Sequence, residues 1–143
     1  MPYAVLHWWI WAIVVVAVCV AAFRYGERDE RIAAAGLLGG WIITMAVYAR
    51  SSTQTEWGIF AVDGVFLAML VYLALISTRY WPLFAAGFQL LAVMIHLAEI
   101  TDRTVGGRAY ISAEIIFGYL LAGAIAAGIL ARRQDRRSER RRL

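Results

Sequence analysis

The sequence predicts an all-α integral membrane protein in which five transmembrane helices form one compact bundle. Hydrophobic residues make up 62% of its 143 residues and the mean hydropathy is +0.66, whereas soluble domains are roughly 45–50% apolar. A spanning helix needs about 20 mostly apolar residues, and such segments occur at residues 3–23, 32–49, 58–76, 83–100 and 109–131. Because their connections are short, residues 1–131 are expected to form one membrane domain, followed by an arginine-rich tail at 132–143.

The first segment is expected to be a retained helix. A cleaved signal peptide begins with a basic region, but the first four residues of this chain carry no charged side chain. Its single cysteine, Cys19, excludes an intrachain disulfide and is expected to take a buried apolar position.

Arginine sets the predicted orientation, because arginines and lysines that flank spanning helices collect on the cytoplasmic side. The chain has 14 arginines and no lysine. In a five-span arrangement eleven arginines fall on one side and only Arg50, Arg103 and Arg108 on the other. The N-terminus is therefore predicted outside and the C-terminus in the cytoplasm. Trp9 and Trp11 are then expected in the outer interface, where tryptophan is enriched.

The tail is predicted to lie against anionic lipid headgroups, which attract each nearby arginine by roughly 1 kcal/mol. Its candidate contact residues are Arg132, Arg133, Arg136, Arg137, Arg140, Arg141 and Arg142. Basic runs also bind nucleic acid, but the tail lacks the aromatic residues that stack on bases. Lipid contact is therefore favoured over nucleic-acid binding or partner docking.

Small residues at helical spacing predict close helix packing, which drives helix association in lipid. The candidates are Gly36, Gly40, Gly118, Ala122, Gly123 and Ala127. Packing inside the bundle is the favoured interpretation. A homo-oligomer or docking onto a larger membrane complex is the alternative.

Ionisable and amide side chains within the apolar segments form the best functional lead. They are Asp63, Gln89, His96, Glu99 and Glu114, and the predicted topology places most of them within about 7 Å of the outer surface. At 100° per residue, Gln89, His96 and Glu99 share about 80° of one helix face. A charge in hydrocarbon costs from about 3 kcal/mol upward, so such residues are usually paired and often functional.

Three interpretations of this polar cluster remain open. It can be an internally hydrogen-bonded network that only stabilises the bundle. It can be part of a proton or cation pathway, although few polar residues continue toward the cytoplasmic side, so a complete channel is not predicted. It can also hold a divalent metal, or a haem whose axial ligands would be His7 and His96. The spacing of these residues matches no recognisable metal motif.

Several enzyme classes are excluded by residues that the chain lacks. Without lysine there is no Schiff base to retinal or any other carbonyl compound. The sequence contains no glycine-rich phosphate loop, HExxH or CxxC motif. The serines lie in no nucleophile elbow.

One stretch resembles known proteins. The run Arg79-Tyr80-Trp81-Pro82-Leu83, followed by Phe88-Gln89-Leu90 and His96-Leu97-Ala98, is similar to that of small, functionally uncharacterised inner-membrane proteins of alphaproteobacteria. The resemblance covers the third to fifth segments and implies a multi-pass protein of a bacterial inner membrane, without implying an activity.

The favoured interpretation is a non-enzymatic accessory or interaction subunit of a membrane assembly, with no cofactor. A small transporter or proton-coupled module that uses the polar cluster is the first alternative. A haem- or metal-binding redox subunit is the second.

Overall fold

A computed structural model describes the backbone at residues 2–50, 55–101 and 107–142, and side chains at 9–47, 57–98, 101 and 112–142. Every regular element in these ranges is a helix. The helices are α1 (Pro2–Tyr25), α2 (Arg28–Arg50), α3 (Thr55–Ile76), α4 (Trp81–Thr101) and α5 (Gly107–Arg142).

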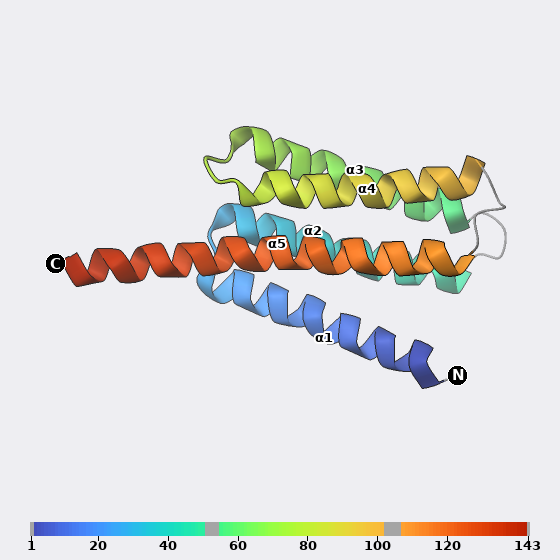
Figure 1. Cartoon of the computed structure of the whole chain (residues 1–143), viewed down its shortest axis with the longest axis horizontal. Coiled ribbons are helices and arrows are strands. Elements are labelled where there is room, and N and C mark those ends of the chain that lie inside the picture. Colours follow the sequence, from blue (N-terminus) through green and yellow to red (C-terminus); the bar gives the residue numbers. More distant parts are fainter. Residues whose placement is uncertain (1, 51–54, 102–106, 143) are drawn as a thin grey trace.

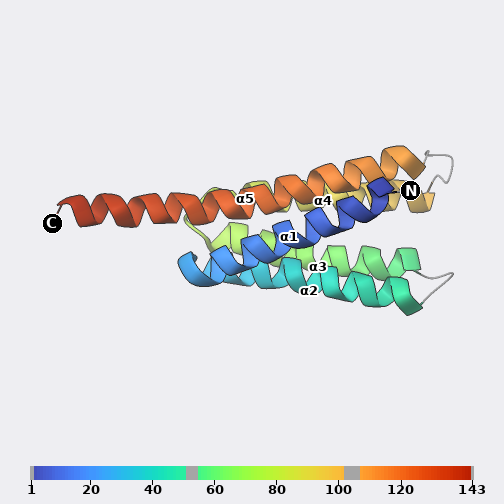
Figure 2. The ribbon, with the colours of Figure 1, turned by 90° about the horizontal axis from the view of Figure 1, so that it is seen from below.

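The helices run alternately up and down (Figure 1), and their packing forms a closed ring. Each packs on the next along the chain, α5 returns to pack on α1, and α2 also contacts α5 across the ring. In the described part of the chain α1 contacts only α2 and α5, and its N-terminal half diverges from the other helices (Figure 1). Seen from below, α1 crosses in front of the layer of α4 and α5 and the layer of α2 and α3 (Figure 2).

Within the described residues, four helices are long and apolar enough to cross a membrane. The candidate spans are Arg28–Val47, Trp57–Ile76, Trp81–Ala98 and Ser112–Arg142. The apolar stretch recognised in α1, Trp9–Tyr25, is shorter. Large hydrophobic side chains such as Val65, Leu75 and Leu83 face outward, as expected of helices whose solvent is lipid.

The α1–α2 and α3–α4 turns lie at the same end of the bundle as the C-terminus, and we call it the arginine end (Figure 1). The N-terminus lies at the opposite end, which we call the N-terminal end. The α1–α2 turn is tight: the Gly26 amide donates to Ala22 O at 2.9 Å, and the Glu27 amide donates to Glu30 Oε2 at 2.9 Å. This side-chain cap, together with acidic Asp29 and Glu30 in the first turn, starts α2 at Arg28, four residues before the predicted apolar segment.

The arginine-rich tail continues α5 as a straight helix to Arg142 (Figure 1). Arginine, glutamate and glutamine are good helix formers, and no glycine or proline interrupts residues 132–142. Glu27 forms ion pairs with Arg132 and with Arg136, the latter at 3.3 Å. The helix is thereby docked on the α1–α2 turn, while the Arg79–Asp135 ion pair, at 2.7 Å, docks it on the α3–α4 turn.

The small residues divide into inward and outward groups. A Cβ on Gly36 would lie 2.4 Å from Met69 Cε, and one on Gly118 would lie 3.2 Å from the Trp11 indole. Ala122 is buried beside them in the core. Gly40 has room for a Cβ, 3.7 Å from Val62. Gly123 and Ala127 face away from the bundle.

Another close helix contact is one that the sequence reasoning did not select. A Cβ on Gly128 of α5 would lie 2.6 Å from Cγ and Cδ1 of the Trp81 indole, at the start of α4. Trp81 and Pro82 are both buried there. Gly128 therefore sets the distance between α4 and α5 near the arginine end.

We expect Gly128→Ala to destabilise the protein by about 1–3 kcal/mol, the usual cost of overpacking, because the buried indole of Trp81 has to move. Gly123→Ala is the matched control, since nothing lies within 4 Å of its Cβ position and alanine favours a helix by roughly 0.5–1 kcal/mol. Reversible unfolding of both variants in detergent micelles measures the difference. Equal stability of the two would contradict the close packing of Trp81 on Gly128.

Candidate polar site

Three helices bring four of the predicted polar residues together near the N-terminal end. Asp63 comes from α3, Gln89 and His96 come from α4, and Glu114 comes from α5. Gln89 and His96 are seven residues apart, two helical turns, and therefore lie on the same face of α4. Both are buried. We call Asp63, Gln89, His96 and Glu114 the His96 cluster.

Asp63 is the centre of the His96 cluster. Its Oδ2 lies 2.8 Å from His96 Nε2, and its Oδ1 accepts from Gln89 Nε2 at 3.1 Å. Gln89 Nε2 also lies 3.3 Å from the backbone oxygen of Asp63. The two oxygens of one carboxylate thus serve two buried side chains, each of which is costly to bury without a partner.

Glu114 approaches the same imidazole nitrogen from α5. Its Oε1 lies 3.9 Å from His96 Nε2. The side chain of Glu114 is 44% exposed and that of Asp63 is 24% exposed, whereas that of His96 is 5% exposed. The carboxylate of Glu114 is therefore the member of the cluster most accessible from outside the bundle.

The interior between the His96 cluster and the arginine end is apolar. Below Asp63 on α3 come buried Phe66, Leu70 and Leu73, and the facing helices add Ala85, Ala86, Leu121, Ala122 and Ile125. Close-packed side chains of this kind leave no room for a chain of water. The cluster is consequently closed toward the arginine end in this structure.

Two further candidates lie outside the described side chains. The side chains of His7 and Glu99 fall in the ranges for which only the backbone is described. Glu99 therefore stays a predicted member of the cluster, and His7 stays a predicted haem ligand.

Among the described residues no group of three or more histidine, cysteine, aspartate or glutamate side chains is arranged to hold a metal ion. To bind a haem iron through Nε2, His96 would have to turn that nitrogen away from Asp63.

A second polar region lies at the arginine end. A recess of about 170 Å³ separates the α1–α2 turn from the α3–α4 turn. Its charged lining is balanced, with acidic Glu27, Asp29 and Glu30 against basic Arg28, Arg79 and Arg132. Much of this charge is already neutralised by the ion pairs that dock α5, so the recess offers a charged ligand little net attraction.

No protein-family model, curated protein or solved structure matches this chain. The His96 cluster therefore has to be interpreted from its own geometry.

The arginine-end ion pairs were not predicted from the sequence, which treated the tail arginines as lipid contacts. One signal was available for the α1–α2 turn. Glu30 follows Glu27 by three residues just ahead of an apolar segment, a spacing typical of a helix start. Nothing in the sequence indicates that Glu27 also reaches Arg132 and Arg136, 105 and 109 residues away.

We expect Asp63→Ala to lower the free energy of unfolding by about 1–3 kcal/mol, because the buried amide of Gln89 loses its side-chain acceptor. Asp63→Asn keeps an oxygen for Gln89, so its loss should be smaller. Asp135→Ala is the matched control, since it removes an exposed ion pair worth at most about 1 kcal/mol. Unfolding in micelles compares the three. A loss for Asp63→Ala no larger than the control's would show that the cluster does not stabilise the bundle.

Proposed function

We propose that this protein is a proton-coupled membrane module whose His96 cluster binds and releases protons from the N-terminal end. The observation that carries the proposal is the position of His96 Nε2 near two carboxylates, 2.8 Å from Asp63 and 3.9 Å from Glu114. An imidazole beside a carboxylate can bind and release a proton at that nitrogen.

Charge balance favours protonation at this place. With both carboxylates ionised and the imidazole neutral, the cluster would hold two negative charges in a bilayer, where each charge costs several kilocalories per mole. A proton on His96 would offset part of this charge. Glu114, the most exposed member, is the point of exchange with water.

The apolar interior between the His96 cluster and the arginine end limits how far a proton can travel. A proton entering at Glu114 meets Phe66, Leu70 and Leu121 beyond Gln89, so the arrangement supports proton binding from one side rather than continuous conduction. The protonation state then acts on the packing of α3, α4 and α5, which supply the cluster. A coupled role of this kind fits a regulated or auxiliary transport step better than a pore.

We further propose that all five helices, α1 included, span a bacterial inner membrane. The N-terminus would lie outside, and residues 132–142 of α5, which we call the α5 extension, would lie in the cytoplasm. Arg24, Arg28, Arg79 and the seven tail arginines belong to the arginine end, and a positive end on the cytoplasmic side is the usual arrangement. The His96 cluster then faces the outer side of the membrane.

Nitrogen-15 NMR of the protein labelled at histidine and reconstituted in lipid tests the proton site. The chain has two histidines, so His96→Gln assigns the spectrum by removing one signal. We expect the His96 ring to change between its neutral and doubly protonated forms across a titration from mild acid to mild alkali. Asp63→Asn should reduce the doubly protonated fraction of His96 at a given pH, because it removes the closest negative charge.

Glu114→Gln should act in the same direction with a smaller effect, since its oxygen lies farther from Nε2. Asp135→Asn, an acidic residue at the arginine end, serves as the control and should leave the His96 signal unchanged. A His96 ring that keeps one protonation state throughout, or that responds equally to all three variants, would overturn the proposal.

A second candidate function is an accessory or interaction subunit of a membrane assembly, or a homo-oligomer. Gly123 and Ala127 favour it, because these small residues face away from the bundle and small residues on an outer helix face allow another helix to approach closely. Native mass spectrometry after gentle extraction from the protein's own membrane tests this. Recovery with a partner that Gly123→Leu releases would support it, and recovery as a single chain before and after that substitution would exclude it.

A further inference from the structure

We propose that the outward face of α1 is a binding site for one anionic phospholipid, whose phosphate lies between Arg24 and Arg133. Its acyl chain would follow the apolar side chains of α1 toward the N-terminal end. This inference is independent of the His96 cluster and of the function proposed for it, because it concerns another face of the bundle.

The apolar part of the site is an open groove along α1. It has a volume of about 620 Å³ and is lined by Trp9, Ile13, Val16, Ala17, Val20 and Ala21, among others. The alanines between larger side chains form its floor. Because α1 contacts only α2 and α5 in the described part of the chain, no other described helix covers this face.

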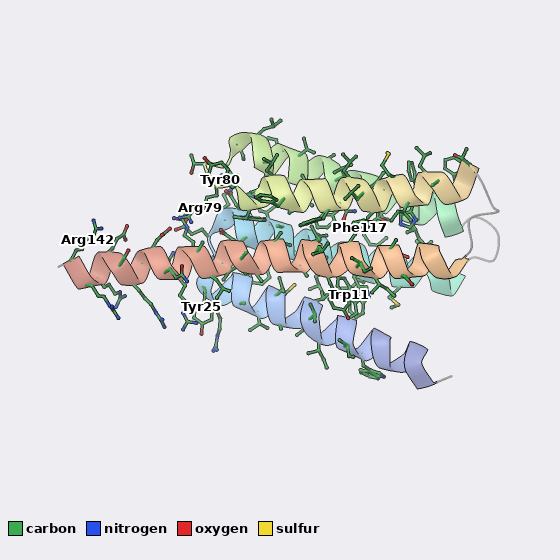
Figure 3. All side chains as sticks on the ribbon, in the orientation of Figure 1. Trp11, Tyr25, Arg79, Tyr80, Phe117 and Arg142 are labelled. Atoms are coloured by element: carbon green, nitrogen blue, oxygen red, sulfur yellow. The ribbon has the colours of Figure 1, made fainter. Side chains whose placement is uncertain are left out.

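The charged part of the site closes the groove at the arginine end. Arg24 and Tyr25 are its last lining residues, and the guanidinium of Arg133 lies 4.7 Å from the centre of the Tyr25 ring. Figure 3 labels Tyr25 where the end of α1 meets the α5 extension. Arg24 therefore lines the end of the apolar groove, and Arg133 of α5 packs on the tyrosine that lines the groove beside it.

Arg24 and Arg133 differ from the three arginines that form ion pairs near the turns. Arg132 and Arg136 pair with Glu27, and Arg79 pairs with Asp135. Neither Arg24 nor Arg133 has a carboxylate partner in the described part of the chain, and both are exposed. A phosphate placed beside Tyr25 would supply the missing negative charge through charge-assisted hydrogen bonds from planar guanidinium groups.

The groove is long enough for one leaflet of acyl chain. From Arg24 back to Trp9 is fifteen residues, about 22 Å of helix, and half of a hydrocarbon core is about 15 Å thick. A lipid with its phosphate at Arg24 therefore extends its acyl chain to about Ile13. A second copy of this chain is a poorer occupant, because a parallel pairing through α1 would bring the Arg24 side chains of both copies together.

The test is native mass spectrometry of the full chain released from nanodiscs made of equal parts phosphatidylglycerol and phosphatidylcholine. We expect the wild type to retain one phosphatidylglycerol. Arg24→Gln and Arg133→Gln should each lower the retained fraction about fivefold, the factor that corresponds to the loss of one arginine near an anionic lipid. Ala17→Phe, which fills the groove on an exposed face and leaves every charge in place, should lower it as well.

Arg142→Gln is the matched control, because it removes the same charge from the far end of the α5 extension. Equal losses from Arg142→Gln and Arg24→Gln would show only general attraction to a negative surface and would overturn the site. Unchanged retention in Ala17→Phe, with helicity preserved by circular dichroism, would overturn the acyl-chain groove. Equal retention of both lipids by the wild type, or a lipid-free dimer, would reject an anionic lipid as the occupant.

Discussion

Two contacts between tryptophan and glycine fix the position of α5, and most of the molecule depends on that position. The Trp11 indole of α1 covers Gly118, and the Trp81 indole of α4 covers Gly128; Figure 3 labels Trp11 between α1 and α5. In lipid, helix association relies on close van der Waals contact rather than on a hydrophobic force between helices. With α5 held by both indoles, Glu114 comes within 3.9 Å of His96 and Arg132 comes within reach of Glu27.

The bilayer also explains why the polar residues gather at one level. Within hydrocarbon a buried amide or imidazole cannot form hydrogen bonds with water, so its hydrogen-bond partners must come from other helices. Asp63 meets that need for Gln89 and His96 at once, and the cluster lies close enough to the N-terminal end for Glu114 to remain accessible. A structural role and a proton-binding role share the same contacts here. Stability alone therefore does not distinguish them, whereas the protonation state of His96 does.

The sequence predicted the helical class and the approximate positions of the apolar segments, because hydrophobic length is a strong signal. It also selected Asp63, Gln89, His96 and Glu114, since polar side chains stand out in apolar segments. It could not give their pairing, which depends on how three separate helices are rotated about their axes. Trp11 shows the same limit, because an interfacial residue and one that covers a glycine on another helix have the same sequence signature.

The extent of α5 was harder to predict for a different reason. An arginine-rich run after a span is compatible with a disordered tail or with a continuing helix, and hydropathy does not separate the two. The deciding contacts are between Glu27 and Arg132 and between Arg79 and Asp135, and both join residues far apart in the sequence. Such long-range ion pairs leave no local pattern, whereas the helix propensity of the run does favour the observed helix.

The middle of α5 and its arginine-rich end resist displacement to different degrees. Exposed ion pairs are worth at most about 1 kcal/mol each and weaken with salt, so the contacts of Arg136 with Glu27 and of Arg79 with Asp135 yield easily. The contacts of Gly118 and Gly128 with two indoles leave no free space and yield only if side chains move. Gly118 and Gly128 are ten residues, about 15 Å, apart along this helix of 36 residues. The middle of α5 is therefore held at two points, whereas the part beyond Gly128 is held by ion pairs that yield more readily.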